Sequence, residues 1–479
     1  MNMNKLITIA AVAASAMAAN AATENITFTT NGVTWRIRLE PEADSYLSEY
    51  GSVGKVAGTA MLGINTSCNN VDNWRNSSIL AIADQNVTVD ASLIPWQFDY
   101  NGTHYTVTKI ALAAFNKYNA TDAKLTGTLT IPDSVTEIRN RAFNNQTSLT
   151  GFSGGRNVKF WGNTTGGGSF ATCSNMVGVY PDMSQAVVFG ASVFEKSTKM
   201  TGTLVLSDML RFVKYYAFQT MQISGAAVIP ASVDTLGGIM GNSNIDYGVF
   251  RDCTKLEAIW VKGKPTAASQ TYTTVYCASF ARYCGSMKMI LMGRNTKGAY
   301  MTQTGDQAML KSDTGVQVFV PANGYWNGLV AGGSNNTIWY YGPDQEFDLE
   351  IDDDTMEATI TPTTANALAN ALAWAPQFKT YFNLDAHISV TNTLDFTDIT
   401  ITEDMVSGVT FDRLVFSAKT QTQLDAILET FPATTPISID PTGLTENMVI
   451  PDGYSNVHVK TVPGVKIRRT VRGFVIFVK

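Results

Sequence analysis

The sequence predicts a β-rich solenoid, in which a short strand followed by a turn or short helix recurs in every repeat. Phenylalanines return every 24 to 32 residues through the middle of the chain, and the segments between them share a pattern. Charged residues make up 15% of the chain, well below the roughly 25% of an average soluble protein. Thr, Asn, Ser and Gly are abundant instead, which favours strands and turns. We expect an N-terminal β cap before the solenoid and a small α/β domain after it.

The first 21 residues have the features of a secretory signal peptide. Lys5 supplies a positive charge, residues 6–19 are apolar, and Ala19-Asn20-Ala21 fits the small-residue cleavage rule. The apolar run is shorter than the roughly 20 residues that a membrane anchor needs. We therefore expect residues 1–21 to be removed and the mature protein to be secreted or held at the cell surface.

Residues 22–92 contain two strand-like runs, 26–30 and 33–39. We expect this region to form the N-terminal β cap, which would cover the apolar edge of the first repeat.

The repeat is built around phenylalanine. In each unit a small or β-branched residue precedes the ring, and in most units a Leu or Met follows six residues later. The repeat phenylalanines are Phe115, Phe143, Phe170, Phe194, Phe218, Phe250 and Phe280. A unit of this length cannot bury its own apolar side, whereas stacked copies bury a continuous one. The spacing therefore predicts a ladder of buried rings, with a second ladder of Leu and Met beside it.

The segment before each ring also recurs. Residues 124–135 (KLTGTLTIPDSV), 199–210 (KMTGTLVLSDML) and 222–233 (QISGAAVIPASV) share one pattern. Alternation of apolar and polar residues at 128–131 and 203–206 predicts a short strand in each unit. Ile131, Leu206 and Ile229 would form a third ladder.

Two segments carry a family resemblance. Residues 129–149 (LTIPDSVTEIRNRAFNNQTSL) resemble the repeat of the BspA-like leucine-rich-repeat surface proteins, and residues 98–110 (FDYNGTHYTVTKI) resemble the strand pair that leads into such arrays. The resemblance covers residues 93–343, including a C-terminal cap of the array. It implies a leucine-rich-repeat solenoid and a non-catalytic role in binding proteins of the host matrix or of partner cells.

The end of the array is rich in aromatic residues, among them Tyr325, Trp326 and Trp339. They are either capping residues that pack inward or a platform that binds sugar rings.

Residues 344–479 read as an α/β domain of unknown function or as a degenerate continuation of the repeats. Helices are expected at 365–382, interrupted by Pro376, and at 421–431. The expected strands are 399–402, 414–417, 437–439, 448–450 and 457–460. The acidic run 348–354 lacks the spacing of a calcium loop, so a solvated turn is the stronger interpretation.

Five cysteines are present, an odd number that cannot be wholly paired. Cys173, Cys253 and Cys284 occupy one repeat position, where we expect buried free thiols. The alternative is a disulfide between Cys277 and Cys284, which are near in sequence.

No pattern predicts catalysis. Residues 151–155 (GFSGG) match the G-x-S-x-G motif of hydrolases, but no helix is expected after them. The three histidines are isolated from one another and from cysteine, so the sequence has no group of His and Cys with the spacing of zinc ligands. The sequence therefore predicts a protein that is not an enzyme and has no cofactor or metal site.

A binding or adhesion protein is the function that these patterns favour, with an extracellular protein or glycan as ligand. The strand residues Thr128, Thr130, Thr203 and Val205 are the candidates for an outward-facing surface. No block of basic residues precedes the last dozen residues, so nucleic acid is not an expected partner. The oligomeric state stays open. The alternatives are a structural component of the envelope or surface layer, and a hydrolase whose active site lies in the C-terminal domain.

Overall fold

A computed structural model of the 479-residue chain places most of its residues. It describes residues 23–43, 47–65, 76–162, 168–238, 248–265, 271–299, 308–311, 313–329, 332–390, 414–417, 420–431, 433, 437–440, 448–454, 457–459, 467–471 and 474–478. The predicted signal peptide, Cys68 and the predicted strand 399–402 lie outside these residues. The chain divides into two compact units. Unit 1 consists of residues 1–288, 295–316 and 327–337, and unit 2 of residues 289–294, 317–326 and 338–479.

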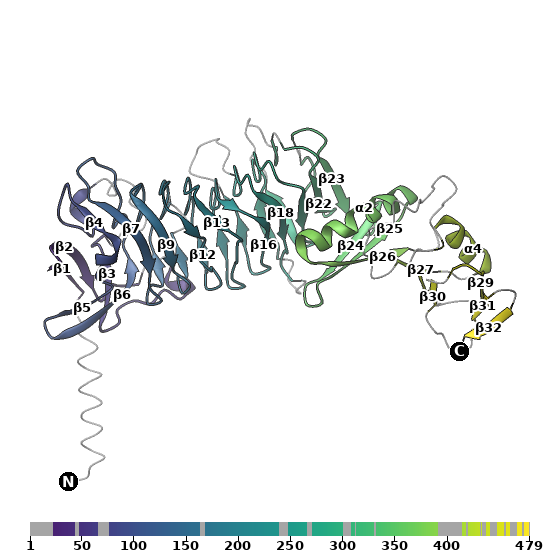
Figure 1. The fold of residues 1–479 in the computed structure, drawn as a ribbon, viewed down its shortest axis with the longest axis horizontal. Helices are drawn as coiled ribbons and strands as arrows, with labels where there is room; N and C mark the ends of the chain where they lie inside the picture. Colours follow the sequence, from purple (N-terminus) through teal and green to yellow (C-terminus); the bar gives the residue numbers. More distant parts are fainter. Residues whose placement is uncertain are drawn as a thin grey trace, which may run out of the picture. The chain divides into compact units, whose positions relative to one another are not determined.

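One long sheet runs along unit 1 (Figure 1). Within the described residues it contains twelve strands, and from β6 onward they pair in parallel, each with the strand of the next repeat. In sheet order they are β1 (Glu24–Thr30), β2 (Val33–Leu39), β3 (Thr59–Leu62), β6 (Thr103–Ile110), β8 (Glu137–Ile138), β10 (Phe160–Trp161), β12 (Val188–Phe189), β14 (Phe212–Val213), β17 (Thr235–Leu236), β19 (Thr273–Tyr276) and β21 (Thr296–Ala299), with β5 (Gln97–Tyr100) beside β6. We call this sheet A.

Shorter sheets form the second side of unit 1. Parallel pairing joins the strands of successive repeats here as well. They are β4 (Thr88–Asp90), β7 (Lys124–Ile131) and β9 (Leu149–Gly154) in one sheet, β11 (Gly178–Val179), β13 (Met200–Gly202) and β15 (Gln222–Ile223) in the next, and then β16 (Gly225–Ile229) with β18 (Leu256–Val261). The repeats therefore contribute strands to two sides of unit 1, which is the parallel, strand-rich arrangement of a repeat solenoid.

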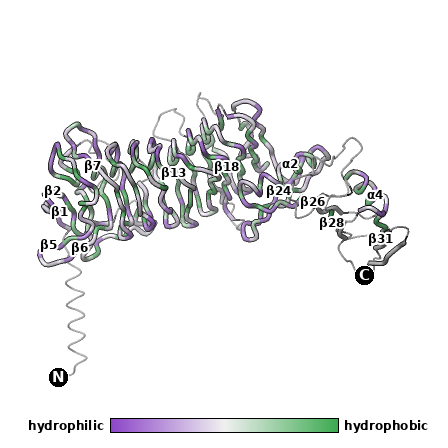
Figure 2. Tube along the Cα trace, in the orientation of Figure 1, coloured by the Kyte–Doolittle hydropathy of each residue, from purple (hydrophilic) through white to green (hydrophobic). Residues whose placement is uncertain are grey.

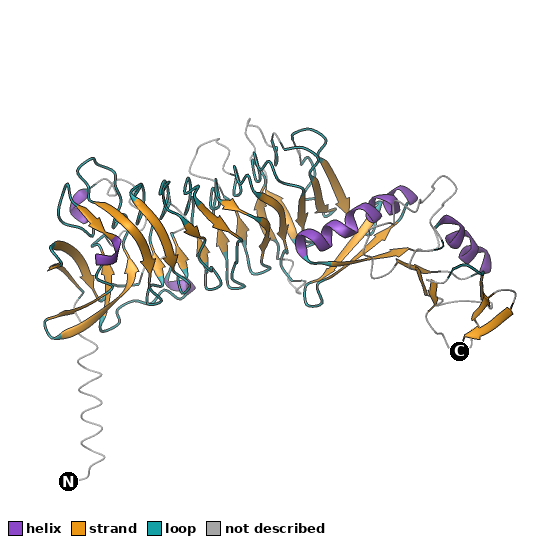
Figure 3. Cartoon of the chain, viewed as in Figure 1, coloured by secondary structure: helices purple, strands orange, loops and turns teal. Residues whose placement is uncertain are grey.

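Turns join the two sides (Figure 3). Within the described repeats no helix takes this place. The short 3-10 helices of unit 1 precede the first ladder ring: η1 (Ser48–Tyr50), η3 (Ser77–Ile79) and η4 (Ala91–Leu93). The second residue after the ring has a left-handed backbone in five repeats, at Asn145, Thr172, Lys196, Thr220 and Asp252, with φ between 60° and 63°. Since this conformation is costly for residues with a Cβ, and most of all for β-branched ones, the turn is fixed by stacking and not by local preference.

The short strand predicted at 203–206 does not form. Only Leu206 makes a bridge, to Met183, and β13 ends at Gly202. Leu206 is half-buried, while Ile131 and Ile229 are buried, so the third ladder is incomplete. The alternation at 203–206 still sets the side-chain directions, because Leu204 is buried between exposed Thr203 and Val205.

Unit 2 combines strands with the two α-helices of the described residues. Its first three strands along the chain are β20 (Met289–Met292), β22 (Gln317–Pro321) and β23 (Thr337–Tyr341), which begins one residue before the segment 338–479. A six-stranded sheet follows, in the order β24 (Phe347–Asp352), β25 (Glu357–Pro362), β26 (Asp385–Val390), β27 (Leu414–Ser417), β28 (Ile437–Asp440) and β30 (Val457–Val459). A small sheet holds β29 (Met448–Ile450), β31 (Ile467–Val471) and β32 (Phe474–Val478). Helix α2 (Ala365–Phe382) joins β25 to β26, and α4 (Gln421–Thr430) joins β27 to β28, so both complete parallel β-α-β connections.

Helix α2 continues through Pro376, where the sequence predicts an interruption. A proline inside a helix removes one backbone hydrogen bond and normally kinks or breaks it. Here Trp374 and Phe378, on either side of the proline, both pack on the ring of Phe319, with ring centroids 5.0 and 5.3 Å apart. This buried packing outweighs the lost hydrogen bond.

Candidate binding surfaces

The interior of unit 1 is a stack of aromatic rings. All seven repeat phenylalanines are buried, with at most 3% of their surface exposed. The rings of Phe115, Phe143, Phe170 and Phe194 lie nearly parallel, with successive centroids 4.9, 4.9 and 5.2 Å apart. Phe189 stands beside the next step, 6.5 Å from Phe194 and 4.8 Å from Phe218. Apolar residues accordingly recur along every coil of unit 1 (Figure 2).

A hydrogen-bond donor follows five of the seven rings, three residues after the ring in four repeats and four residues after Phe280, and reaches back to the preceding repeat. Gln146 Nε2 donates to the carbonyl of Phe115 at 2.6 Å, and Ser197 Oγ to that of Phe170 at 2.9 Å. The thiols at the same repeat position do likewise: Cys173 donates to Phe143, Cys253 to Phe218 and Cys284 to Phe250. We call this set the donor ladder. Most of these carbonyls also accept a backbone N–H within their own turn, so the donor ladder adds a second hydrogen bond that ties each repeat to the one before it.

The cysteines are therefore part of the packing. Cys173, Cys253, Cys277 and Cys284 are free and buried, so the alternative disulfide between Cys277 and Cys284 is absent. Burial raises the pKa of the Cys173 thiol to about 12 and that of Cys284 well above its usual value. A neutral, buried thiol is a poor nucleophile.

Leu47 and Tyr50 cover part of the outer side of sheet A, at β10, β12 and β14. Leu47 packs with Phe160, Val187 and Val188 in one buried cluster, against which Tyr50 and Phe212 also pack. This contact lies on the side of sheet A away from the ring stack, because Phe160 alternates with Trp161, which contacts Phe170. The outer faces of Phe160 and Val188 are thus unavailable to a ligand in this conformation.

A buried ion network lies beneath the same segment. Glu137 accepts from Arg139 Nε at 2.6 Å and lies 3.1 Å from Lys109 Nζ, and Ser52 Oγ donates to it at 3.1 Å. Burial raises the pKa of Glu137, but the charges and hydrogen bonds of Arg139 and Lys109 outweigh it and lower the pKa overall. The carboxylate therefore remains ionised and holds two cations out of water.

The second side of unit 1 exposes the predicted strand residues. Thr128, Thr130 and Thr203 are exposed, and Val205 is 48% exposed. Thr130 Oγ1 lies 2.9 Å from Ser153 Oγ on the neighbouring strand, and Thr128 lies over Gly151, which leaves no room for a Cβ there. We call the surface formed by these five side chains, Thr128, Thr130, Ser153, Thr203 and Val205, the threonine face. Its members make few internal contacts, so they can vary without disturbing the core.

The serine of the hydrolase-like motif belongs to this face. Ser153 lies in strand β9, paired in register with Thr130, and not at a turn between a strand and a helix. Of the histidines whose side chains the structure describes, His104 pairs with Asp99 and His387 lies beside Glu357. The motif and the histidines therefore do not form a catalytic arrangement in the described residues.

The three aromatic candidates of unit 2 have different surroundings. Tyr325 is 46% exposed. Trp326 is fully buried, so its ring cannot contact a ligand in this conformation and it is a packing residue. Trp339 is half-buried, with its ring centroid 4.6 Å from that of Trp374 and its indole N–H donating to Gln317.

The acidic run 348–354 has structural partners. Asp348 pairs with Arg294 at 2.5 Å, and Asp352 Oδ1 accepts from the backbone N–H groups of Asp354 and Thr355 in a tight turn. Among the residues that the structure places, no group of three potential metal ligands comes together. Nor does any placed helix have the length and apolar character to cross a bilayer.

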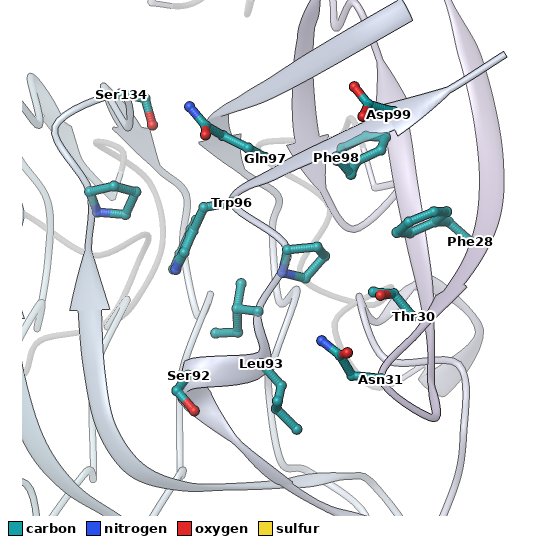
Figure 4. A pocket seen from close by; sticks show the side chains of 13 residues that line it. Phe28, Thr30, Asn31, Ser92, Leu93, Trp96, Gln97, Phe98, Asp99 and Ser134 are labelled. Atoms are coloured by element: carbon teal, nitrogen blue, oxygen red, sulfur yellow. The ribbon is translucent and has the colours of Figure 1, made fainter. Parts of the chain in front are cut away.

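A pocket of about 600 Å³ lies among the N-terminal hairpins of unit 1 (Figure 4). Asn31, in the tight turn Asn31-Gly32 between β1 and β2, lines it. A second tight turn, Asn101-Gly102, joins the wall strand β5 to β6 but lies outside the lining; each turn has two consecutive positive φ values. The walls of the pocket come from the first hairpin, from the segment around η4 and β5, and from the turn after β7. The lining residues are Phe28, Thr30, Asn31, Ser92, Leu93, Ile94, Pro95, Trp96, Gln97, Phe98, Asp99, Pro132 and Ser134.

Comparison with known proteins identifies the repeat. Residues 108–257 match the family model described as BspA type leucine rich repeat region, in six copies. These residues are BspA-type leucine-rich repeats. No protein in the curated set matches the sequence.

Two solved structures resemble the chain at low similarity. One is a leucine rich cell surface protein from Faecalibacterium prausnitzii, 14% identical, with 92% of this chain and 97% of that chain covered and a TM-score of 0.31. The other is a leucine-rich repeat protein from Bacteroides ovatus, 11% identical, with 92% and 98% covered and a TM-score of 0.21. At these values neither structure informs the function of this chain.

Sequence patterns do not indicate most of the residues that line the pocket, which precede the BspA-type repeats in the chain. Phe28, Asn31, Trp96 and Gln97 lie outside the repeated unit, so periodicity cannot select them. The two Asn-Gly dipeptides were an available signal, because they predict tight hairpins, but not that the hairpins lie together.

Proposed function

We propose that this protein is a secreted or cell-surface, non-catalytic binding protein that uses its BspA-type repeats to present a surface for an extracellular protein or glycan. The threonine face supports the proposal. Its side chains are exposed on the open side of unit 1, while the ring stack and the donor ladder hold the fold without them. A solenoid of this kind offers an extended surface whose residues can change independently of the core.

The proposed location rests on the signal-like N-terminal sequence, and an adhesion role rests on the repeat family. The proposed ligand contacts are Thr128, Thr130, Thr203 and Val205 in unit 1, with Tyr325 and Trp339 as further candidates in unit 2. The proposed domain organisation is that of the sequence: signal peptide 1–21, β cap 22–92, repeat solenoid with C-terminal cap 93–343, and α/β domain 344–479.

The test is a binding screen of the purified full chain against extracellular-matrix proteins and glycan arrays. The double variant Thr203→Arg/Val205→Arg places two long cations on the threonine face, and we expect it to weaken binding at least tenfold. Thr314→Arg is the matched control, because Thr314 is an exposed threonine outside this face. Equal loss in both variants would show that charge, and not the threonine face, governs binding.

The alternative roles give different results in the same preparation. A surface-layer component would assemble with itself, which light scattering detects, and would retain no affinity for the arrays. A hydrolase would release products from the immobilised glycans or proteins. Either result without reversible binding would refute the proposal.

A further inference from the structure

The pocket among the N-terminal hairpins has the wall of a small-ligand site. Its volume of about 600 Å³ falls in the range of roughly 300–1,000 Å³ that such sites occupy. The rings of Phe28 and Phe98 lie 5.2 Å apart at a tilt of 35°. Half-buried Trp96 adds a third ring (Figure 4). Ile94 and Pro132 also line the pocket and extend its apolar surface.

Side-chain amides interrupt this apolar wall without any internal task. The amides of Asn31 and Gln97 are exposed, and neither donates to or accepts from another described residue. The side-chain hydroxyls of Thr30 and Ser134 also make no hydrogen bond to another described residue. An amide both donates and accepts hydrogen bonds. The pocket therefore offers a set of neutral, bifunctional groups that the fold does not use.

The charge of the wall excludes anionic ligands. Asp99 is the only ionisable residue among the thirteen that line the pocket, and it pairs with exposed His104 at 2.9 Å. No lysine or arginine is present to neutralise a phosphate, sulfate or carboxylate. A ligand that fits carries no negative charge, has an apolar face, and carries groups that donate and accept hydrogen bonds.

We propose that this pocket binds a neutral sugar unit of a glycan. The C–H face of the sugar would lie on the aromatic wall, and its hydroxyls, which both donate and accept, would bond to the amides of Asn31 and Gln97. An extended peptide fits the wall less well, because its backbone presents fixed, alternating donors and acceptors and the pocket's polar groups come from scattered side chains. The inference rests on the proposed binding function and names its ligand class.

The experiment uses the purified full chain and two probes: an array of neutral oligosaccharides, and methyl glycosides of mannose, galactose and N-acetylglucosamine titrated by saturation-transfer NMR. Asn31→Asp and Gln97→Glu keep the side-chain shape, remove the amide donors and add a charge. Asn101→Asp is the matched control, because Asn101 holds the same position in the other hairpin turn and does not line the pocket. Trp96→Ala removes the ring, and its circular dichroism spectrum reports whether the fold is intact.

We expect Asn31→Asp, Gln97→Glu and a folded Trp96→Ala each to weaken sugar binding at least tenfold, with Asn101→Asp unchanged. Sugar binding that survives all three pocket variants but fails in Thr203→Arg/Val205→Arg would overturn the pocket and keep the proposed function. Binding of a matrix protein that the three pocket variants weaken, without any sugar binding, would overturn the ligand class. No binding of any matrix protein, peptide or glycan would overturn the proposed function itself.

Discussion

Removal of one ring from the centre of the stack tests how the solenoid is held together. Phe143 is fully buried, and its ring lies 4.9 Å from that of Phe115 and 4.9 Å from that of Phe170, with interplanar angles of 7° and 12°. Truncation of a buried phenylalanine to alanine costs roughly 3–5 kcal/mol. Each aromatic pair adds about 0.5–1.5 kcal/mol beyond the buried area. The truncation range already includes lost ring contacts, and Phe143→Ala loses two such pairs, so we expect a cost near its upper end, about 4–5 kcal/mol.

Phe280→Ala provides the comparison within the same stack. Phe280 is equally buried, but among the described rings it contacts only Phe250, edge-on at 5.6 Å and 78°. Because Phe280→Ala loses one aromatic pair and not two, we expect a cost of about 3 kcal/mol. Guanidinium unfolding followed by tryptophan fluorescence suits both variants, because Trp161 lies 6.2 Å from the ring of Phe170 and reports on the stack. A cost below about 1 kcal/mol for Phe143→Ala would refute the claim that stacked rings hold unit 1.

Three further predictions concern the ion network, the turns and the thiols. Glu137→Ala should destabilise the protein by roughly 3–5 kcal/mol, because Lys109 and Arg139 stay buried without their partner. Since folding lowers the pKa of Glu137, its stabilisation is present above the ordinary pKa of 4.5 and should fade as pH falls through the folded pKa. Glu137→Ala should therefore show a flatter profile of unfolding free energy against pH between 5 and 2. Thr172→Gly should stabilise the protein by about 0.5–1 kcal/mol, because a β-branched residue at φ 63° is strained; a lower melting temperature would contradict the strain. Cys173→Ser should change the free energy of unfolding by less than about 1 kcal/mol, because serine fills that position in the next repeat. In the native protein, the Cys173 thiol should react with a thiol reagent at pH 8 only after unfolding, as mass spectrometry of the labelled peptide would show.

Periodicity in the sequence predicts the features that recur in every repeat or every helical turn. The seven phenylalanines are recognisable because each repeat places a ring at the same point, and helix α2 begins and ends at the residues that its apolar spacing predicts. Pro376 shows the limit of local rules, since contacts of Trp374 and Phe378 with a distant ring hold the helix together. The alternation at 203–206 likewise predicts side-chain directions, but not whether the backbone pairs as a strand.

The remaining features depend on contacts between segments far apart in sequence. Phe189 enters the ring stack from a strand of sheet A, at a position that the repeat spacing does not mark. Leu47 covers Phe160 across more than a hundred residues of sequence. The same holds for the pocket, which needs Phe28 and Phe98 side by side. Trp326 is a further case, because aromatic composition alone cannot distinguish a buried ring from an exposed one.

The donor ladder has one interruption. Met221 occupies the position that Gln146, Ser197 and the cysteines fill elsewhere, and a thioether has no proton to give to the carbonyl of Phe194. The direct parallel stacking also changes at this step, where Phe189 mediates between Phe194 and Phe218. The array is thus joined less tightly at one internal seam than at its other junctions. Backbone amide hydrogens at the junction between the repeats of Phe194 and Phe218 should exchange with solvent faster than those in the repeats on either side. The solenoid would then unfold locally at this internal junction as well as from its ends.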